Sequence, residues 1–303
     1  MIAITWRINP DLDAVACAVA YEHYRKQQWI NDRVAVFQGN PHPEAMFVCR
    51  ELWIELKKWV SEEYNTWIMV DFSQKFWLPS FIDPARVIEV IDHRWFPDYD
   101  YFPNAKFQIE LVWSAATLIA EKFQFNNIWI SPEMANVLYC WTLSNTLNFK
   151  ANVTTFRDYR SADWLISQWA KVELWKQMFD FKTKYIQENL EEVLLEDSKT
   201  STLPNNDTIN MMQLELLNGN FLYTMWNITE QLRSKWLLHV DHATIFVQDL
   251  ELWKTRIYVE EWLKDLFTHK WFEWALVDKF RREMPKLYLR KELIPMINKL
   301  CIE

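Results

Sequence analysis

Carboxylates and one histidine recur directly after apolar runs in the first hundred residues. Asp11 and Asp13 stand two apart in "NPDLD", Asp71 follows "WIMV", and Asp92 and His93 follow "RVIEVI". Carboxylate oxygens and imidazole nitrogens are ligands that suit Mn²⁺ or Mg²⁺. Each motif alone has a plainer interpretation, because a lone aspartate at the start of a helix often serves only as its cap. Their joint order favours a divalent-cation site.

Alternating strands and helices are predicted to position these side chains. Strands are expected over residues 1–5, 33–38, 67–73 and 86–93, and helices over 9–26, 43–52, 114–123 and 131–147. Such alternation is typical of an α/β fold with a mainly parallel sheet. The carboxyl edge of that sheet is where open α/β proteins bind ligands, so the aspartates and His93 should meet there.

The second half of the chain predicts a smaller α/β domain. A long charged helix is expected over 172–197 and a polar linker over 198–208, followed by strands over 209–217, 243–252 and 255–261, with helices near 227–236 and 274–280. We therefore predict a metal- and phosphate-binding domain over 1–185, an interdomain helix end and linker over 186–208, and a substrate-binding domain over 209–303. The active site is expected in the cleft between the two domains.

Composition limits the partners. The net charge of -8 argues against broad binding to nucleic acid, which requires clustered Lys and Arg. No run of about 18 apolar residues exists, so no membrane-spanning helix is expected. Four scattered cysteines without CxxC spacing are typical of reduced thiols, and a cytoplasmic protein is expected.

The chain has 2 glycines and 19 tryptophans. An average glycine content of about 7% predicts roughly 21 glycines in a chain of this length. Several tryptophans occupy turn or helix-end contexts, where a positive φ or a missing side chain is required. These include Trp77, Trp95, Trp129, Trp271 and Trp274. One hypothesis is that most tryptophans are glycines in the biological protein, as when UGA encodes glycine but is translated as tryptophan. The alternative is a natural or engineered chain that is rich in tryptophan.

The motifs resemble those of the DHH phosphoesterase superfamily, and most closely those of the manganese-dependent (family II) inorganic pyrophosphatases. The resemblance runs through "INPDLDAVACAVAY", "IMVDFSQ", "VIEVIDHR", "ELVWSAATLI" and "LSNTLNFKANVTT". It covers most of residues 3 to 155 and returns weakly in "LRKELIP". At Trp6, Trp67, Trp113 and Trp141 the family usually has glycine or another small residue, which supports the glycine hypothesis.

The resemblance implies two neighbouring metal ions, but the ligand set is altered. Asp11, Asp13, Asp71 and His93 match family ligands, and Asn145 aligns with a family aspartate. Family histidines align with Arg7, Phe72 and Arg94. One ion site is therefore expected to be weak or lost, so that the protein binds one or two ions of manganese or magnesium.

The resemblance also suggests roles in substrate binding and reaction. Asp92 and Arg94 are assigned to the reaction itself. Arg7 and Arg94 are expected to contact phosphate oxygens, as are Arg290 and Lys291 near the C-terminus, although a solvated basic turn is an equal alternative for that pair.

Three functions remain open from the sequence. The first is a pyrophosphatase-like hydrolase that acts on pyrophosphate or another small phosphorylated substrate. Assembly into a homodimer is also left open. The second is a catalytically inactive homologue that binds a phosphorylated ligand. The third is a nucleotide phosphodiesterase of the same superfamily, whose C-terminal motif would fall loosely on residues around Trp271 and Trp274.

Overall fold

The computed structural model describes residues 1–6, 8–58, 64–94, 96–224, 239–259, 275–278 and 281–300. The chain forms two compact units. The N-terminal unit comprises Met1–Phe149 and Val153–Met178, and the C-terminal unit comprises Lys150–Asn152 and Phe179–Glu303. The predicted domain boundaries at 185 and 208 stay predictions.

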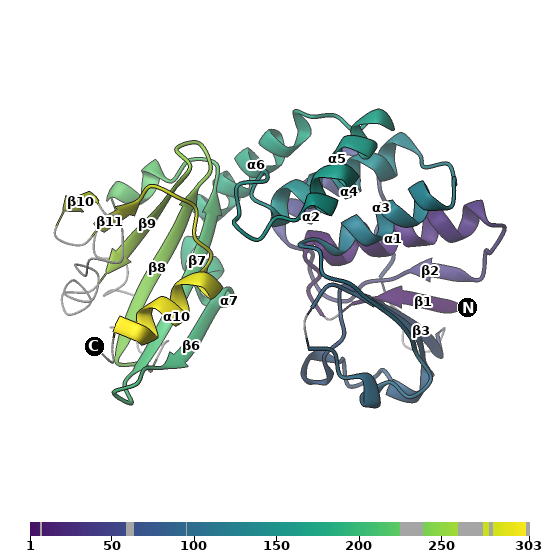
Figure 1. The fold of residues 1–303 in the computed structure, drawn as a ribbon, viewed down its shortest axis with the longest axis horizontal. Coiled ribbons are helices and arrows are strands. Elements are labelled where there is room, and N and C mark those ends of the chain that lie inside the picture. Colours follow the sequence, from purple (N-terminus) through teal and green to yellow (C-terminus); the bar gives the residue numbers. More distant parts are fainter. Residues whose placement is uncertain are drawn as a thin grey trace. The chain divides into compact units, whose positions relative to one another are not determined.

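The N-terminal unit contains a five-stranded parallel sheet with the order β2-β1-β3-β4-β5 (Figure 1). Its strands are β1 (Ile2–Thr5), β2 (Arg33–Ala35), β3 (Thr66–Val70), β4 (Val87–Asp92) and β5 (Lys106–Ile109). The apolar runs of β3 and β4 are buried, as expected of strands in a covered parallel sheet. The predicted α/β fold with a mainly parallel N-terminal sheet is confirmed.

Among the residues that the structure describes, five α-helices accompany this sheet. They are α1 (Leu12–Gln27), α2 (Pro43–Glu51), α3 (Ala115–Phe125), α4 (Pro132–Asn145) and α5 (Phe156–Ser167). Helix α1 packs against β1, β2 and β3, and also against α3 and α4. Its alanines Ala14, Ala16, Ala18 and Ala20 are completely buried, which allows these neighbours to approach closely. Figure 1 shows α1, α3, α4 and α5 gathered on one side of the sheet.

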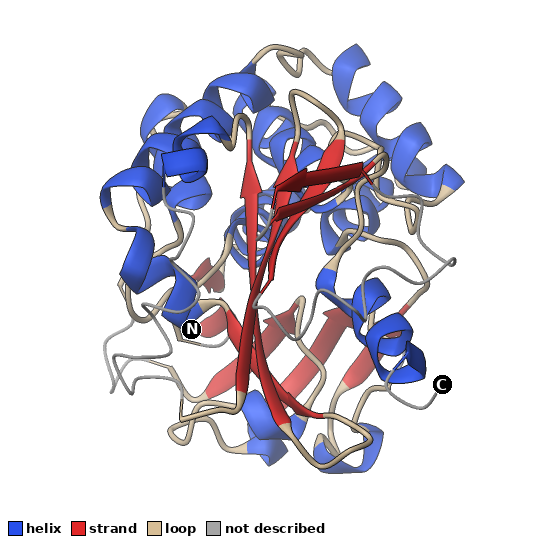
Figure 2. Cartoon of the chain, turned by 90° about the vertical axis from the view of Figure 1, so that its left-hand side faces the viewer, coloured by secondary structure: helices blue, strands red, loops and turns tan. Residues whose placement is uncertain are grey.

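The C-terminal unit contains a six-stranded mixed sheet with the order β10-β11-β9-β8-β7-β6, whose strands are labelled in Figure 1. Figure 2 draws the strands of both sheets in red. Its strands are β6 (Ser198–Thr202), β7 (Thr208–Leu216), β8 (His242–Asp249), β9 (Lys254–Val259), β10 (Ala275–Asp278) and β11 (Arg281–Met284). Only β7 and β8 are parallel among the described pairs. The predicted second α/β domain is confirmed as an α/β unit.

Helices cover both faces of this second sheet. Helices α6 (Leu174–Glu188) and α7 (Leu190–Glu196) contribute Ile186, Leu190 and Leu194 to an apolar cluster with β7 and β8. Helix α10 (Arg290–Leu300) contributes Leu293 and Ile297 to a separate cluster, which includes Phe246 and Ile257.

Three expectations for the second half differ from the structure. The expected single helix over 172–197 is divided at Asn189 into α6 and α7. Residues 198–202, expected in a linker, form the edge strand β6, in which Thr200 and Thr202 are exposed and Ser198 and Ser201 are partly buried. Its polar composition resembles that of a loop. Residues 275–278, expected to be helical, form the edge strand β10. The helix expected near 227–236 lies outside the described residues.

No helix within the described ranges combines the length and the apolar character needed to cross a bilayer.

Candidate metal centre

The candidate centre lies at the carboxyl ends of β1, β3 and β4. The order in which successive strands are added to the sheet reverses between β1 and β3, and sheets of this topology bind ligands at such a point. After β1, Asp11 caps α1 and accepts a hydrogen bond from the Ala14 amide at 3.0 Å. The first turn of α1 then carries Asp13.

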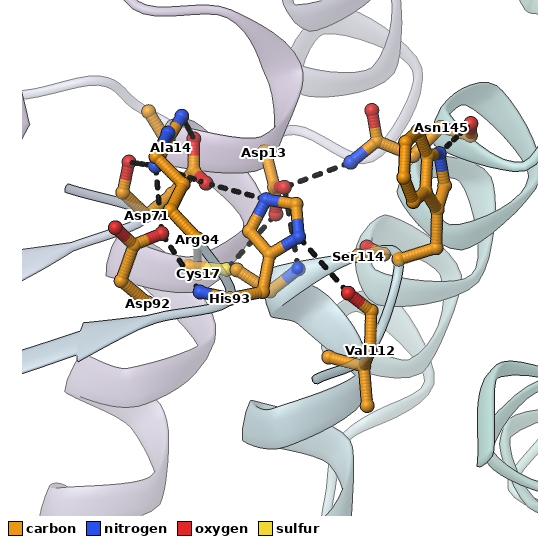
Figure 3. Close-up of polar contacts among 12 residues, drawn as sticks. Asp13, Ala14, Cys17, Asp71, Asp92, His93, Arg94, Val112, Ser114 and Asn145 are labelled. Atoms are coloured by element: carbon orange, nitrogen blue, oxygen red, sulfur yellow. Dashed lines mark hydrogen bonds and ion pairs between the residues drawn. The ribbon is translucent and has the colours of Figure 1, made fainter. Parts of the chain in front are cut away.

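Asp13, Asp71 and His93 each offer one ligand atom, and these three atoms lie within 4.8 Å of one another (Figure 3). Asp13 and Asp71 are buried, whereas His93 is partly buried. Two carboxylate oxygens and an imidazole nitrogen form a donor set that Mn²⁺ accepts. The residues present therefore fit a divalent cation.

Asp13 is held by contacts from three helices. Its Oδ2 accepts hydrogen bonds from Asn145 Nδ2 at the end of α4 (2.9 Å) and from the Ala115 amide at the start of α3 (3.3 Å). Its Oδ1 accepts a hydrogen bond from Cys17 Sγ, one turn further along α1, at 3.2 Å. Burial and the nearby charge of Asp71 raise the pKa of Asp13 well above its usual range.

The imidazole of His93 is fixed through both nitrogens. Its Nδ1 lies 3.1 Å from the Val112 carbonyl oxygen, and its Nε2 lies 3.2 Å from Asp71 Oδ1. Burial opposes the charged imidazolium, but the hydrogen bond and charge of Asp71 outweigh it and raise the pKa of His93 to about 9. An Nδ1–H donated to a backbone carbonyl directs Nε2 toward the acidic cluster, an arrangement typical of metal-binding histidines.

Arg94 pairs with two of the carboxylates. Its Nη1 lies 3.0 Å from Asp71 Oδ1 and 2.7 Å from Asp92 Oδ1, and its Nη2 lies 3.3 Å from Asp71 Oδ2. Nη1 also donates a hydrogen bond to the Asp71 carbonyl oxygen. Burial opposes ionisation of Asp71, but the charge of Arg94 and the hydrogen bond from His93 together lower the pKa of Asp71.

Asp92 is fully buried beneath this arginine. Its Oδ1 accepts hydrogen bonds from the His93 amide (2.8 Å) and from Arg94, and its Oδ2 accepts one from the Ser73 hydroxyl. Burial raises the pKa of Asp92, although Arg94 acts in the opposite direction. These contacts hold the loop that carries His93 and Arg94.

Other predicted site residues have different surroundings. Asn145 presents its amide nitrogen to Asp13, so binding a cation through its oxygen requires the amide group to turn over. Arg290 starts α10 in the C-terminal unit, where its guanidinium contacts Met211 O (2.9 Å) and Asp197 Oδ1 (3.1 Å). Lys291 is exposed on the same helix. Arg7 lies outside the described residues.

Sequence reasoning did not identify Ser73, Cys17 or the Val112 carbonyl. Cys17 follows Asp13 by one helical turn, so local spacing could have indicated it. Ser73 contacts Asp92, 19 residues further along the chain, so local spacing could not have indicated its role. The contact between Val112 and His93 spans 19 residues, and no local pattern predicts it.

Trp113 contacts a residue of the centre, and Trp141 lies one helical turn before Asn145 on α4. Trp113 donates its Nε1–H to the Asn145 carbonyl at 2.7 Å and is partly buried. Trp141 is buried in α4, and its Nε1 has no hydrogen-bond partner among the described residues. A buried N–H without a partner is unfavourable by about 1–3 kcal/mol, so the indole of Trp141 is poorly accommodated.

Known proteins resemble the chain in sequence over about half its length. No family model matches the chain. A Bacillus mycoides (strain KBAB4) protein and a Bacillus cereus (strain AH187) protein, both provisionally named manganese-dependent inorganic pyrophosphatases, are 27% and 28% identical to it over 157 residues. Each match covers 51% of this chain and 50% of the relative, so the chain spans about half the length of these relatives.

Solved structures resemble the fold over almost the whole chain. A Methanococcus jannaschii protein, provisionally assigned as a family II inorganic pyrophosphatase, matches with a TM-score of 0.71, 19% identity and coverage of 100% of both chains. An exopolyphosphatase-related protein from Bacteroides fragilis matches with a TM-score of 0.51 and 13% identity, covering 99% of this chain and 91% of the other. These identities establish likeness of fold alone.

The motifs at the strand ends, the sequence similarity of half the chain and the shared fold point to the same group of proteins. The resemblance indicated by the sequence is therefore confirmed: the chain is similar to the manganese-dependent, family II inorganic pyrophosphatases of the DHH phosphoesterase superfamily.

Proposed function

We propose that this chain hydrolyses the phosphoanhydride bond of inorganic pyrophosphate, or of another small phosphorylated substrate, with the help of manganese or magnesium. The observation that carries the proposal is the convergence of Asp13, Asp71 and His93 beside Arg94 at one edge of a parallel sheet. The similarity of half the chain to proteins named as manganese-dependent pyrophosphatases supports the choice of metal and substrate.

A divalent cation bound at this centre supplies positive charge to phosphate oxygens and lowers the pKa of a coordinated water. Asp13, Asp71 and His93 would hold this cation, and the Val112 carbonyl keeps His93 Nε2 directed toward the carboxylates. The proposed cation-binding set also includes Asp11, the N-cap residue of α1. Its last member is Asn145, which would bind through its side-chain oxygen.

Arg94 supplies the fixed positive charge for substrate. A guanidinium has five N–H donors in a fork that matches phosphate oxygens. Nη2 of Arg94 makes one hydrogen bond among the described residues, and 34% of the side chain is exposed. A phosphate can therefore reach this group from solvent. Asp92 acts as a positioning residue in this scheme, since its oxygens accept hydrogen bonds from Arg94, His93 and Ser73.

Phosphate release from pyrophosphate tests the proposal. The chain should release phosphate with Mn²⁺ or Mg²⁺ and stop when the metal is chelated. Asp13→Asn should lose the activity, because it removes a negative charge from the cation site. Asp163→Asn, a change on the exposed surface of α5, is the matched control and should retain it. Release no faster than in the chelated sample, with either metal, contradicts the proposed hydrolase.

The second candidate is a homologue that binds a phosphorylated ligand without turnover. Pairing of Arg94 with Asp71 and Asp92 favours this candidate, because it occupies carboxylates that could otherwise bind cations. Pyrophosphate would then raise the melting temperature of the chain in the presence of Mn²⁺ while no phosphate is released.

The remaining predictions concern residues or properties that the structure does not describe. Arg7, proposed to contact phosphate, and Trp271 and Trp274, on which the phosphodiesterase interpretation depends, lie outside the described residues. Lys291 is described by the structure, exposed on α10, and stays a candidate phosphate ligand. A cytoplasmic location, a homodimer, the exclusion of nucleic acid and an active site between the domains also stay predictions.

A further inference from the structure

Buried negative charge is concentrated at the candidate metal centre. Asp13 is 1% exposed, Asp71 is 2% exposed and Asp92 is completely buried. A buried carboxylate needs a compensating positive charge or several hydrogen bonds to remain ionised. The compensation available to each of these groups therefore determines how many cations the centre requires.

Asp92 is already compensated within the protein. Both of its oxygens accept hydrogen bonds: Oδ1 from Arg94 and the His93 amide, and Oδ2 from Ser73. Asp71 is also engaged by Arg94, through both of its oxygens.

Arg94 Nη1 occupies the space between Asp71 and Asp92. It lies 3.0 Å from an oxygen of Asp71 and 2.7 Å from an oxygen of Asp92, which makes it the shared counter-charge of this carboxylate pair. A metal ion placed between the same two oxygens would overlap the guanidinium and be repelled by its charge. The side of Asp71 that faces Asp13 and His93 is the remaining place for a cation.

We propose that Arg94 is a built-in cation that restricts the centre to a single divalent metal ion, held by Asp13, Asp71 and His93. The inference rests on the proposed function only in taking this centre to bind a divalent cation. The number of bound ions can be measured without any hydrolysis.

The number of bound Mn²⁺ ions tests this inference. The chain, freed of metal and titrated with Mn²⁺ in a calorimeter, should bind one equivalent. Arg94→Met removes the charge while preserving much of the side-chain volume, and should bind a second equivalent. Arg94→Lys keeps the charge and should bind one equivalent.

Arg157→Met is the matched control. Arg157 also pairs with two carboxylates, Glu110 and Glu121, and its side chain is 33% exposed, compared with 34% for Arg94. It lies at α5 and contacts none of the three cation-binding residues. This variant should bind one equivalent, as the parent does.

Two results would overturn the inference. One is binding of two equivalents, or of none, by the unmodified chain. The other is an Arg94→Met variant that folds, as judged by its circular dichroism, and still binds one equivalent. A chain that binds one Mn²⁺ but releases no phosphate from pyrophosphate contradicts the proposed function and leaves this inference intact, so the two failures are distinguishable.

A second, independent inference concerns the ends of three helices. Helices α1, α2 and α5 are each followed, after one further residue, by a tryptophan with positive φ: Trp29 (64°), Trp53 (55°) and Trp169 (72°). At each end the next amide bonds back across the turn, from Ile30 to Arg25 O (3.0 Å), from Ile54 to Cys49 O (2.9 Å) and from Ala170 to Leu165 O (3.1 Å). These contacts define Schellman motifs, in which the left-handed position is normally glycine.

The indole rings gain little from these positions. Trp29 is 91% exposed, Trp53 is 94% exposed and Trp169 is 79% exposed, so the unfavourable backbone conformation is not offset by burial. Helix α3 ends with the same motif, and its left-handed residue is Asn127, a type that tolerates this conformation. A fourth tryptophan, Trp253, has a φ of 55° in the turn between β8 and β9.

We infer that these four tryptophan positions are glycines in the biological protein. One route to this difference is a gene in which UGA specifies glycine. An aromatic docking surface is the competing explanation for exposed tryptophans. It does not account for their positions, because a docking surface has no need of a positive φ.

Peptide mass spectrometry of the protein from its native source decides the matter. Trypsin should release residues 27–33, "QQWINDR", after Lys26. We expect the mass of this peptide with glycine in place of Trp29, and the same replacement in the peptides that contain Trp53, Trp169 and Trp253. Peptides with the tryptophan mass would refute the inference.

The melting temperature of the chain as printed provides a second measurement. Trp29→Gly, Trp53→Gly and Trp169→Gly should each raise it, by roughly 2 °C, because glycine relieves the strain of a positive φ. Trp129→Gly is the control: Trp129 is 60% exposed but does not have a positive φ, so no rise is expected. Equal effects at all four sites would contradict the backbone argument.

Discussion

Arg94 donates hydrogen bonds to Asp71 from both terminal nitrogens of its guanidinium, which lie 3.0 Å and 3.3 Å from the two carboxylate oxygens. The same Nη1 reaches Asp92 at 2.7 Å. Asp92, the last residue of β4, and Asp71, which follows β3, are thereby joined by one side chain (Figure 3). Asp71 itself has a φ of 52°, a left-handed conformation that aspartate tolerates better than most residues.

The contributions of Arg94 and Asp92 to stability should be energetically coupled. In a double-mutant cycle of Arg94→Met and Asp92→Asn, each single change should lower the free energy of unfolding. Arg94→Met leaves Asp92 without its counter-charge, and Asp92→Asn removes one of the two carboxylates that pair with Arg94. The coupling energy should be about 1–3 kcal/mol, reduced by the partial exposure of Arg94. Urea denaturation in the presence of a chelator measures it. Additive single changes would show that the pair contributes nothing to stability.

Mn²⁺ should stabilise the folded chain, and its removal should reverse the effect. A ligand that binds only the native state adds about 2.7 kcal/mol to the free energy of unfolding at a concentration 100-fold above its Kd. Asp13→Asn should abolish this gain, whereas Asp163→Asn on α5 should preserve it. Thermal unfolding with Mn²⁺ and with chelator provides the comparison. A gain of the same size in Asp13→Asn would mean that the metal binds elsewhere.

Asn145 should control the affinity of the centre through Asp13. Its Nδ2 donates to Asp13 Oδ2 at 2.9 Å, so Asn145→Leu removes a contact that orients a metal ligand. Loss of such a contact typically weakens metal affinity about 10–100-fold. Asn145→Asp should have the opposite effect on Mn²⁺ affinity and should destabilise the metal-free chain, because it adds a negative charge beside Asp13. Calorimetric titration with Mn²⁺ measures both variants. Identical affinities in all three proteins would remove Asn145 from the site.

Arg290 should contribute to the stability of the fold, whereas Lys291 should not. Arg290 is buried, and its guanidinium contacts Met211 O and Asp197, so Arg290→Met should lower the free energy of unfolding by roughly 1–3 kcal/mol. Lys291 is exposed, so Lys291→Met should leave stability almost unchanged. If Lys291 binds substrate, its replacement should raise the KM for pyrophosphate. A stable Arg290→Met variant with a raised KM would instead assign Arg290 to substrate binding.

Much of the N-terminal unit could be predicted from the sequence because its signals are local. Apolar runs that end in Asp71 or in Asp92 and His93 indicated buried parallel strands, and the fold confirmed them as β3 and β4. The C-terminal unit was less predictable at its edges. Strand β6 has the polar composition of a linker, and only its pairing with β7 makes it a strand.

The sequence by itself determined which residue types reach the carboxyl edge of the first sheet, since strand ends and helix starts are encoded locally. It also determined the shortage of glycine. Only the tertiary structure decided how these side chains pair. The contacts of Arg94 with Asp71, of His93 with Val112 and of Asn145 with Asp13 join residues 19 to 132 positions apart, and they depend on strand order and helix packing rather than on any local pattern. The backbone dihedral angles likewise decided which tryptophans stand where glycine is required, because a positive φ depends on the geometry of each helix end.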